Sequence, residues 1–399
     1  MQNELDIEKS LTSKITDFLL EMRIASLFAN IGVAEACLNE LDNAHVVVAN
    51  EWLPRRAALY HAIYPETNMI CGDITDEAVY QQILQACRRE RVDTIMATPP
   101  CQGMSTAGQK IKFDERNSLV MHAIRLIHDI NPRYVIIENV PDFIITPIMY
   151  HGIETMLPDV VSQELQDNYD IDIHTIDTDD YGVPQTRDRM IILMTRHDVR
   201  RKWSLPPKDN HKVTMEEAIG DLPSIDPFVK DLNPEQFHVL FPLYEERRQR
   251  ALEISPWNIP PVHVWRQVKA MMYTPTGQTA FDNPMEHRPM KIDGSLVRGY
   301  HNTYKRQNWD RPAYTVTMDN RKISSQNNVH PGRLVGQDEN GENIYSDART
   351  LTLYELMRVM SIPEEWNVPM NTDEAFLRRI IGEGIPPLFM RKLFAQITR

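Results

Sequence analysis

Short apolar runs alternate with longer amphipathic stretches throughout the first half of the chain. The apolar runs have the length and composition of strands, and they occupy residues 23–28, 46–50, 92–97, 134–139 and 190–195. Between them, apolar residues recur at helical spacing, as in 76–90 and 117–130. Strands that are apolar throughout are buried on both faces, which is typical of a mostly parallel sheet flanked by helices. We therefore predict an α/β, Rossmann-like fold that binds its ligands beyond the carboxyl ends of the strands.

This alternation stops after residue 195. Residues 196–310 are rich in proline and predict a second, smaller, loop-rich domain. Regular patterning returns at residue 311, with a strand expected at 314–317, a hairpin or loop at 338–343 and a helix at 353–360. We therefore divide the chain into an α/β domain (1–195), the loop-rich domain (196–310) and a C-terminal segment (311–399) that returns to the first domain.

The charge of the chain is unevenly distributed. The net charge of the 399 residues is −13, which taken alone argues against a nucleic-acid partner. Residues 1–195, however, hold 15 Lys and Arg against 30 Asp and Glu, whereas residues 196–310 hold 17 against 15 and residues 311–399 hold 11 of each. A uniformly basic coat protein is excluded, but a nucleic acid facing the mildly basic middle region is not.

The sequence also bears on compartment and metal content. The first 14 residues are polar, and no apolar run reaches the ~18–20 residues of a membrane span. The four cysteines lack the spacing of metal ligands, and we expect Cys37, Cys71 and Cys87 to be buried thiols. These features indicate a reduced, cytoplasmic protein with no membrane partner and no metal.

The strongest local signal for chemistry follows the expected strand at 92–97. There, Pro99 and Pro100 stiffen the backbone and place the thiol of Cys101 at the end of the strand. A second signal is Glu138, which ends the apolar run 134–139, where partial desolvation suits a general acid. Each residue also has a structural interpretation without chemistry. Cys101 could be a buried cysteine in a proline turn, and Glu138 could be a loop acid or a helix cap.

Two arginines precede the last expected strand of the first domain. Arg187 and Arg189 are two positions apart, so their side chains share one face of an extended segment. Two guanidinium groups can together bind a carboxylate, a carbonyl oxygen or a phosphate. The alternative interpretation is that both arginines form ion pairs at the surface.

A nucleoside site is indicated near the N-terminus. The segment from Ser26 to Gly32 is a strand-to-helix turn, and Glu51 lies nineteen positions beyond Gly32, where an acid can bind a ribose diol. Trp52 could lie flat on an adenine, and Asp73 with Ile74 follows the next short strand. The turn lacks G-x-G-x-x-G, which disfavours a nicotinamide dinucleotide. S-adenosylmethionine, which has no pyrophosphate, fits better.

In their order along the chain, these motifs resemble those of the DNA (cytosine-5)-methyltransferases of bacteria and phages. The resemblance runs from Ser26 to Pro387 and leaves only 196–310 without recognisable motifs. Its later segments are Tyr304–Thr317, His330–Arg333, Arg349–Arg358 and Gly382–Pro387. Each motif is weak alone, but ten of them in family order are specific.

The resemblance implies a role for each matching residue. Cys101 would attack C6 of a cytosine flipped out of double-stranded DNA, Glu138 would bind N3, and Arg187 and Arg189 would assist while S-adenosylmethionine supplies the methyl group to C5. The implied cofactor contacts are Phe28, Asn30, Ile31, Gly32, Glu51, Trp52, Asp73, Ile74, Pro100, Leu119, Glu383 and Ile385. The DNA contacts are Gln102, Ser105, Gln185, Arg247, Arg248 and Arg298, with 196–310 as the target-recognition domain. A monomer that protects a site from a cognate restriction endonuclease follows from the same resemblance.

Four positions depart from the family pattern. Ser26 stands where the family has Asp, Asn30 and Val33 where it has Gly, and Glu383 where it has Asn. Asparagine tolerates a left-handed backbone, which valine does not, and Glu383 adds a negative charge near the expected cofactor. An RNA cytosine-5 methyltransferase and a non-catalytic DNA-binding relative therefore remain as alternatives.

Overall fold

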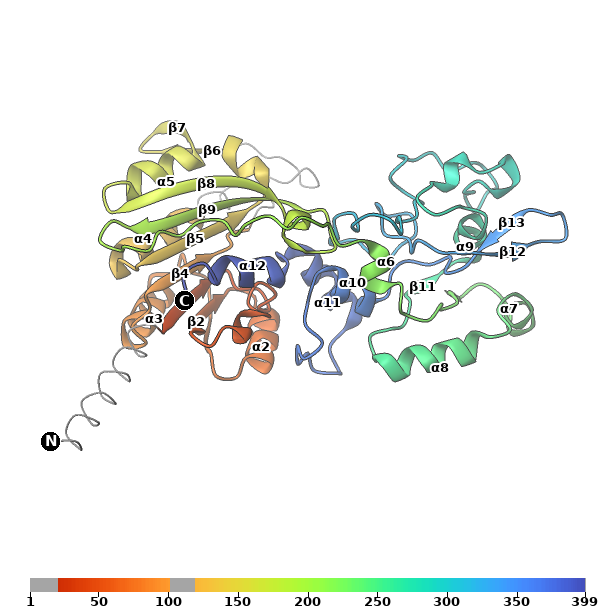
Figure 1. Cartoon of the computed structure of the whole chain (residues 1–399), viewed down its shortest axis with the longest axis horizontal. Helices are drawn as coiled ribbons and strands as arrows, with labels where there is room; N and C mark the ends of the chain where they lie inside the picture. The colour runs from red at the N-terminus through yellow and green to blue at the C-terminus, as the bar shows by residue number, and fades with distance from the viewer. Residues whose placement is uncertain (1–20, 101–118, 399) are drawn as a thin grey trace.

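The computed structural model describes residues 21–100 and 119–398, which form two lobes joined side by side (Figure 1). In the α/β lobe, the described residues form a seven-stranded sheet of order β3-β2-β1-β4-β5-β9-β8. Its strands are β1 (Met22–Leu27), β2 (Ala44–Glu51), β3 (Asn68–Cys71), β4 (Thr94–Ala97), β5 (Tyr134–Asn139), β8 (Tyr169–Asp177) and β9 (Asp188–Arg196). The first five are parallel, and β9 runs antiparallel to both β5 and β8. The predicted α/β fold with a mostly parallel sheet is confirmed.

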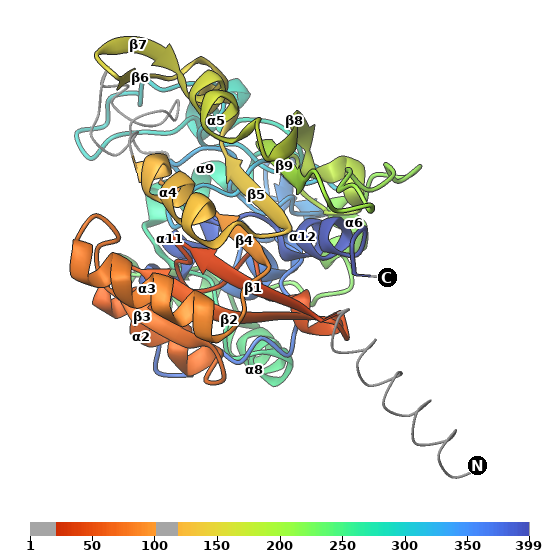
Figure 2. The same ribbon diagram turned by 90° about the vertical axis from the view of Figure 1, so that its left-hand side faces the viewer.

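Both faces of the sheet are covered, which explains the unbroken apolar runs. On one face lie α3 (Glu77–Arg89), α4 (Val120–Ile130) and α5 (Leu157–Leu165), and on the other lies α12 (Pro387–Phe394) (Figure 2). Along β5, Val135 and Ile137 pack toward the first group of helices, whereas Ile136 packs toward α12. Successive side chains of one strand therefore enter two different apolar clusters.

The remaining elements of this lobe border the sheet. They are η1 (Leu38–Glu40), α2 (Pro54–Ile63), η3 (Pro141–Ile145), the hairpin of β6 (Pro147–Tyr150) and β7 (Ile153–Met156), and η4 (Thr178–Tyr181). No helix in the described ranges is long and apolar enough to cross a membrane.

The second lobe is built from short elements. They are α6 (Met215–Ile219), β10 (Phe228–Val229), α7 (Pro234–Leu240), α8 (Tyr244–Ile254), β11 (Val262–His263), α9 (Trp265–Met272), η5 (Ala280–Asp282), η6 (Met285–His287), β12 (Leu334–Gln337) and β13 (Asn343–Tyr345). Of these, α6 packs with α10 (Leu353–Val359) and α11 (Glu374–Glu383), and most of the others surround a separate apolar cluster. The cluster joins Val268 and Met271 to Val329 and Ala348, so residues on both sides of position 310 build one core.

The C-terminal segment then returns to the α/β lobe. Helices α10 (Leu353–Val359) and α11 (Glu374–Glu383) pack against Ile31 and Val33 of the turn after β1. The expected helix at 353–360 is therefore present, and the stretch 338–343 links β12 to β13 as a hairpin.

Two local expectations were wrong. Residues 314–317 form no strand, because the amide of Val316 donates to the side chain of Gln185 at 2.9 Å and only an isolated bridge joins Gln185 to Ala313. Cys71 is exposed, since it ends the short edge strand β3, whereas Cys37 and Cys87 are buried as expected.

Candidate functional site

The carboxyl ends of three neighbouring strands, β1, β4 and β5, are tied together by hydrogen bonds. The backbone amide of Thr98 donates to the carbonyl of Leu27 at 3.2 Å, and its hydroxyl donates to the carbonyl of Phe28 at 3.2 Å. From β5, the side-chain amide of Asn139 donates to the carbonyl of Pro99 at 3.1 Å. The proline turn after β4 is thereby held between the other two strand ends. Cys101, Gln102 and Ser105, which follow it, lie outside the described residues.

Glu138 and Arg189 form a buried ion pair at this edge of the sheet. The Arg189 Nε lies 2.7 Å from Glu138 Oε1, with side-chain exposures of 10% and 11%. Burial raises the pKa of Glu138, and the positive charges of Arg189 and Arg187 oppose that rise. The pair comes from adjacent strands, since Glu138 lies opposite Ile191 in the antiparallel ladder of β5 and β9. The carboxyl group is thus fixed in direction by one arginine while its environment favours the protonated form.

Arg187 and Gln185 hold the C-terminal segment against the sheet. The Arg187 guanidinium donates to the carbonyls of Val316 and Gly382, both at 2.8 Å. Gln185, which we expected to meet DNA, is fully buried, and its amide nitrogen points to the sulfur of Met360 and the carbonyl of Val359. In this arrangement the Gln185 side chain has no surface with which to contact DNA. Its side chain closes the junction between β9 and α10 instead.

The turn after β1 has the left-handed backbone that its sequence suggested. Three alternate residues have positive φ, namely Phe28 (59°), Asn30 (53°) and Gly32 (80°). A Cβ at Gly32 would lie 2.2 Å from the ring of Tyr64, whose hydroxyl donates to the Gly32 carbonyl at 2.6 Å. Asn30 therefore preserves the turn, and Gly32 is required both by its backbone and by the close approach of Tyr64.

Glu51 closes this turn from the end of β2. Its two carboxylate oxygens accept from the backbone amides of Asn30 (3.0 Å) and Leu53 (2.8 Å), and burial raises its pKa. Each oxygen retains a second lone pair for a ligand hydroxyl. The neighbouring Trp52 is 62% exposed, so its ring is free to cover a flat ligand. Asp73, after β3, accepts from the amide of Thr75 at 2.9 Å.

The departures at Asn30, Val33 and Glu383 prove to be connected. Glu383, at the end of α11, lies 2.9 Å from Arg56 of α2 and accepts from the side-chain amide of Asn30 at 3.3 Å. Arg56 thus balances the extra negative charge. Val33 does not have a left-handed backbone, and it packs on Gly384, where a Cβ would lie 2.8 Å from Val33 Cγ1. The sequence did not reveal the role of Arg56, because it depends on α11 approaching α2 from more than three hundred residues away.

The other expected cofactor contacts are mostly core side chains. Ile31, Ile74 and Ile385 are each at most 2% exposed and belong to three different apolar clusters. Leu119 is the residue before α4, and Pro100 is the last described residue of the turn after β4. These residues border the strand ends, and their side chains mainly support the turn.

The three expected DNA-contacting arginines of the second lobe differ in their partners. Arg247 forms an ion pair of 2.6 Å with the largely buried Asp226, whereas Arg248 lies 3.9 Å from the exposed Glu245. Arg298 is exposed and has no acidic partner among the residues that the structure describes. Only Arg298 of the three is therefore unengaged.

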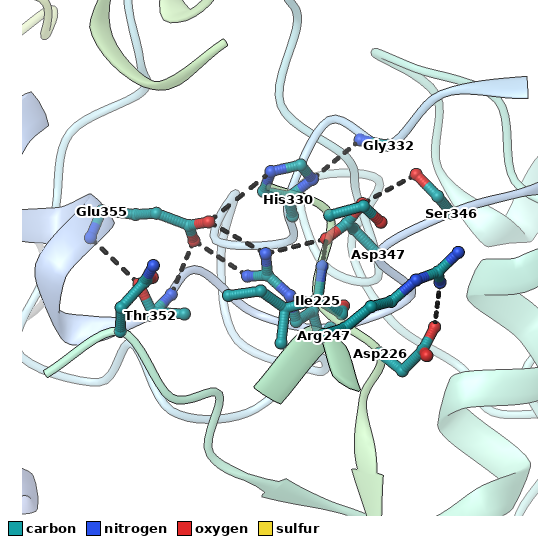
Figure 3. A network of polar contacts seen from close by, with 12 residues as sticks. Ile225, Asp226, Arg247, His330, Gly332, Ser346, Asp347, Thr352 and Glu355 are labelled. Atoms are coloured by element: carbon teal, nitrogen blue, oxygen red, sulfur yellow. Dashed lines mark hydrogen bonds and ion pairs between the residues drawn. The ribbon is translucent and has the colours of Figure 1, made fainter. Parts of the chain in front are cut away.

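A buried polar network joins the second lobe to α10 (Figure 3). At its centre, Arg349 is fully buried and lies 2.8 Å from both Asp347 and Glu355. Its Nε donates to the carbonyl of Ile225 at 3.0 Å, and His330 lies 3.7 Å from Glu355. The network thereby connects the start of the second lobe, its last hairpin and the helix that returns to the α/β lobe.

One group of side chains in the described ranges could hold a metal ion. Ligand atoms of Glu286, His287 and Glu342 lie within 4.8 Å of one another, and His287 already pairs with Glu342 at 2.7 Å. This group belongs to the second lobe and is separate from the strand ends.

Comparison with known proteins identifies the family. A family model described as C-5 cytosine-specific DNA methylase matches residues 22–399. The chain belongs to this family. It is 38% identical over 377 residues to the type II methyltransferase M1.HgaI of Avibacterium volantium, covering 93% of this chain and 97% of that one. It is 25% identical to the type II methyltransferase M.XorII of Xanthomonas oryzae, covering 89% and 79%.

Solved structures show the same fold. A DNA modification methyltransferase encoded within an E. coli prophage aligns with a TM-score of 0.63 at 18% identity, covering 94% of this chain and 98% of that one. The methyltransferase EhMeth of Entamoeba histolytica aligns with a TM-score of 0.58 at 12% identity, with the same coverage. The protein is therefore a DNA (cytosine-5)-methyltransferase, similar to those of type II restriction–modification systems.

Proposed function

We propose that the enzyme transfers a methyl group from S-adenosylmethionine to C5 of a cytosine flipped out of a specific short sequence in double-stranded DNA, through a covalent bond between Cys101 and C6. The observation that carries this proposal is the buried pair of Glu138 and Arg189 beside the turn that leads into Cys101. The pair provides an oriented carboxyl group at the carboxyl end of β5, next to the strand end that Cys101 follows in the sequence, and we assign it to binding of N3.

Each step of the reaction uses a group of this chain. The Cys101 thiolate adds to C6 while Glu138 donates a hydrogen bond or proton to N3, so the electron pair of the C5–C6 double bond becomes available at C5. When bound, S-adenosylmethionine would supply an electrophilic methyl group to C5, and its sulfur would leave with the bonding electrons as the neutral thioether S-adenosylhomocysteine. A base then removes the C5 proton, and the returning electrons expel Cys101 as a thiolate. Arg189 keeps Glu138 directed at the base throughout.

The turn after β1 supports binding of S-adenosylmethionine. Glu51 stands at the end of β2 with free lone pairs for a ribose diol, and the exposed Trp52 adjoins it. The buried Oδ1 of Asn30 has no hydrogen-bond partner within the described part of the chain. A buried acceptor without a donor costs free energy, which a ligand donor would recover. These groups fit a nucleoside cofactor that lacks a pyrophosphate.

The second lobe supports recognition of the duplex. In the proposed division of labour, residues 1–195 bind cofactor and cytosine, 196–310 face the DNA, and 311–399 return to the first domain. A cytosine within a duplex cannot reach Glu138, so it has to be flipped out, at a cost of a few kcal/mol. We further propose that the enzyme acts as a monomer, and its similarity to type II methyltransferases supports a cognate endonuclease as its partner system.

The covalent step can be tested with duplex DNA that contains 5-fluorocytosine at the methylation site. Fluorine cannot leave as a proton does, so the wild-type enzyme should remain bonded to the DNA and migrate as a stable adduct. Cys101→Ala should form no adduct, and Glu138→Gln should form it about 10²–10⁴-fold more slowly, the usual contribution of a general acid.

Cys71→Ala is the matched control, because Cys71 is the exposed thiol at the end of β3. It should form the adduct at the wild-type rate. A wild-type enzyme that binds labelled S-adenosylmethionine but methylates RNA rather than any duplex would refute the DNA assignment. An enzyme that binds DNA but neither cofactor nor methyl acceptor would be the non-catalytic relative.

A further inference from the structure

One short segment of the second lobe carries the two most exposed large apolar side chains in the described part of the chain. Ile292 is 91% exposed and Tyr300 is 81% exposed. They lie eight positions apart, and neither belongs to the apolar core of the second lobe. Holding both an isoleucine and a tyrosine in water is unfavourable unless a partner covers them.

The segment is a rigid turn. The amide of Lys291 donates to the carbonyl of Ser295 at 2.7 Å, and the amide of Val297 donates to that of Pro289 at 2.9 Å. Asp293 accepts from the amide of Ser295 at 2.9 Å and from its hydroxyl at 2.7 Å. Gly294, with φ of 78°, makes the reversal at the tip and has open space around it. Ile292 is therefore presented near the tip of a hydrogen-bonded, hairpin-like turn, and Arg298 and Tyr300 follow directly after its last cross-turn hydrogen bond.

The two cations of this segment, Lys291 and Arg298, are exposed and form no ion pair in the described part of the chain. By contrast, Arg250 pairs with Glu246 at 2.6 Å, and Arg333 pairs with Glu216 at 2.7 Å. Lys230 and Lys269 of the same lobe also lack an acidic partner within the described ranges, so what distinguishes this segment is that its unpaired cations adjoin Ile292 and Tyr300.

A groove of about 440 Å³ runs along the inner side of the turn. Phe281 and Leu296 form its apolar wall, and Arg288, Arg298 and His301 supply its polar groups. Apolar surface beside guanidinium groups suits base edges, which present methyl groups next to hydrogen-bond acceptors.

We infer that the segment 289–300 is the element that reads the recognition sequence of the substrate duplex, with Arg298 as a specificity-determining residue. A two-stranded ribbon fits the major groove of DNA, where an arginine can make two hydrogen bonds to one base. Ile292 and Tyr300 cover apolar parts of neighbouring bases, and Lys291 neutralises a phosphate. The inference rests on the proposed function, because it requires duplex DNA as the substrate.

The test compares sequence preference rather than activity alone. Wild type and variants methylate a library of duplexes with random bases on both sides of one cytosine, and bisulfite sequencing reports which sequences are modified. Arg298→Ala should relax the preference at one base position by about 5–150-fold, the equivalent of 1–3 kcal/mol. Tyr300→Ala should weaken the preference at an adjacent position.

Two further variants separate base reading from charge. Lys291→Ala should lower methylation evenly across all sequences and reduce the salt dependence of binding by about one phosphate contact. Arg250→Ala, which removes an exposed but paired arginine of α8, should leave the wild-type profile unchanged. All four side chains lie at the surface, so unchanged thermal midpoints are expected and should be verified first.

Two results would overturn the inference. If Arg298→Ala and Tyr300→Ala both retain the wild-type profile and rate, the segment does not touch the DNA. Alternatively, both could behave like Lys291→Ala, which would mean that the segment holds only the phosphate backbone. Failure of the proposed function is a different outcome, since the wild-type enzyme would then modify no member of the library.

Discussion

Replacing Arg349 with methionine tests whether the buried network of Figure 3 holds the two lobes together. Methionine retains much of the length of the side chain but removes its charge and all of its donors. In the native protein, Arg349 donates to both oxygens of Glu355 (2.8 and 2.9 Å), to Asp347 (2.8 Å) and to the carbonyls of Ile225 (3.0 Å) and Thr350 (3.1 Å). The variant leaves two buried carboxylates without their shared cation.

The expected loss of stability is about 3–5 kcal/mol, the usual cost of removing one partner from a buried ion pair. Both Asp347 and Glu355 lose the guanidinium as a partner, but each carboxylate still accepts hydrogen bonds from other groups. Asp347 still accepts from the amide of Ile225 at 2.9 Å, and Glu355 still accepts from the amide of Thr352 at 2.7 Å. We therefore expect the cost of one broken pair rather than two.

The loss should depend on pH in a defined direction. Burial, the largest influence, would raise the pKa of Glu355, but Arg349, His330 and the amide of Thr352 together outweigh it and hold that pKa below its usual range. A carboxyl group with a lowered pKa stabilises the native state above its unfolded pKa and loses this contribution as the pH falls. The difference between wild type and Arg349→Met should therefore be largest near neutral pH and shrink in acid.

Urea unfolding followed by tryptophan fluorescence measures this difference, since Trp257 and Trp309 pack next to the network. Arg250→Met is the control and should cost at most about 1 kcal/mol, because Arg250 forms an exposed pair with Glu246. The double variant Arg349→Met/Glu355→Gln should recover part of the loss by removing one uncompensated charge. A loss below about 1 kcal/mol for Arg349→Met would refute the reasoning.

Two further predictions concern the turn after β1. Burial raises the pKa of Glu35 from 4.5 to about 7, so the folded protein holds a proton that the unfolded chain releases, and stability falls as the pH rises through that range. The free energy of unfolding of Glu35→Gln should therefore rise by up to about 3 kcal/mol relative to that of wild type between pH 4.5 and 7. A difference in urea midpoints that does not change with pH would contradict this. Gly32→Ala should weaken S-adenosylmethionine binding at least tenfold by calorimetry and lower stability by more than Gly152→Ala. Both glycines have φ near 80°, but a Cβ at Gly152 meets nothing within 4 Å, so equal losses would show that the contact of Gly32 with Tyr64 is unimportant.

The main features of the fold could be read from the sequence because they depend on local patterning. Runs such as 134–139 have no polar residue until their last positions, and only a strand buried on both faces accommodates them. The position of Glu138 at the end of β5 follows from the same run. The left-handed turn at Asn30 and Gly32 was also predictable, since few other residues tolerate positive φ.

Expectations about the direction and surroundings of side chains succeeded less often. Gln185 looked like a DNA contact but is buried, and residues 314–317 looked like a strand but pair with that side chain instead. The partner of Glu383 could not be foreseen either, because nothing near Arg56 in the sequence indicates an acid approaching from α11. Which cations remain free, such as Arg298, depends equally on where distant acids come to lie.

The sequence by itself determined the sheet, the strand ends beside which we propose the reacting groups, and the family of the protein, because apolar periodicity and short motifs act over a few neighbouring residues. Only the tertiary structure decided which charges are paired, how Arg56 balances the charge of Glu383 beside the turn after β1, and which turn of the second lobe presents unpaired cations beside exposed apolar side chains. The physical reason is that ion pairing and burial depend on distances between residues far apart along the chain, and folding alone sets those distances.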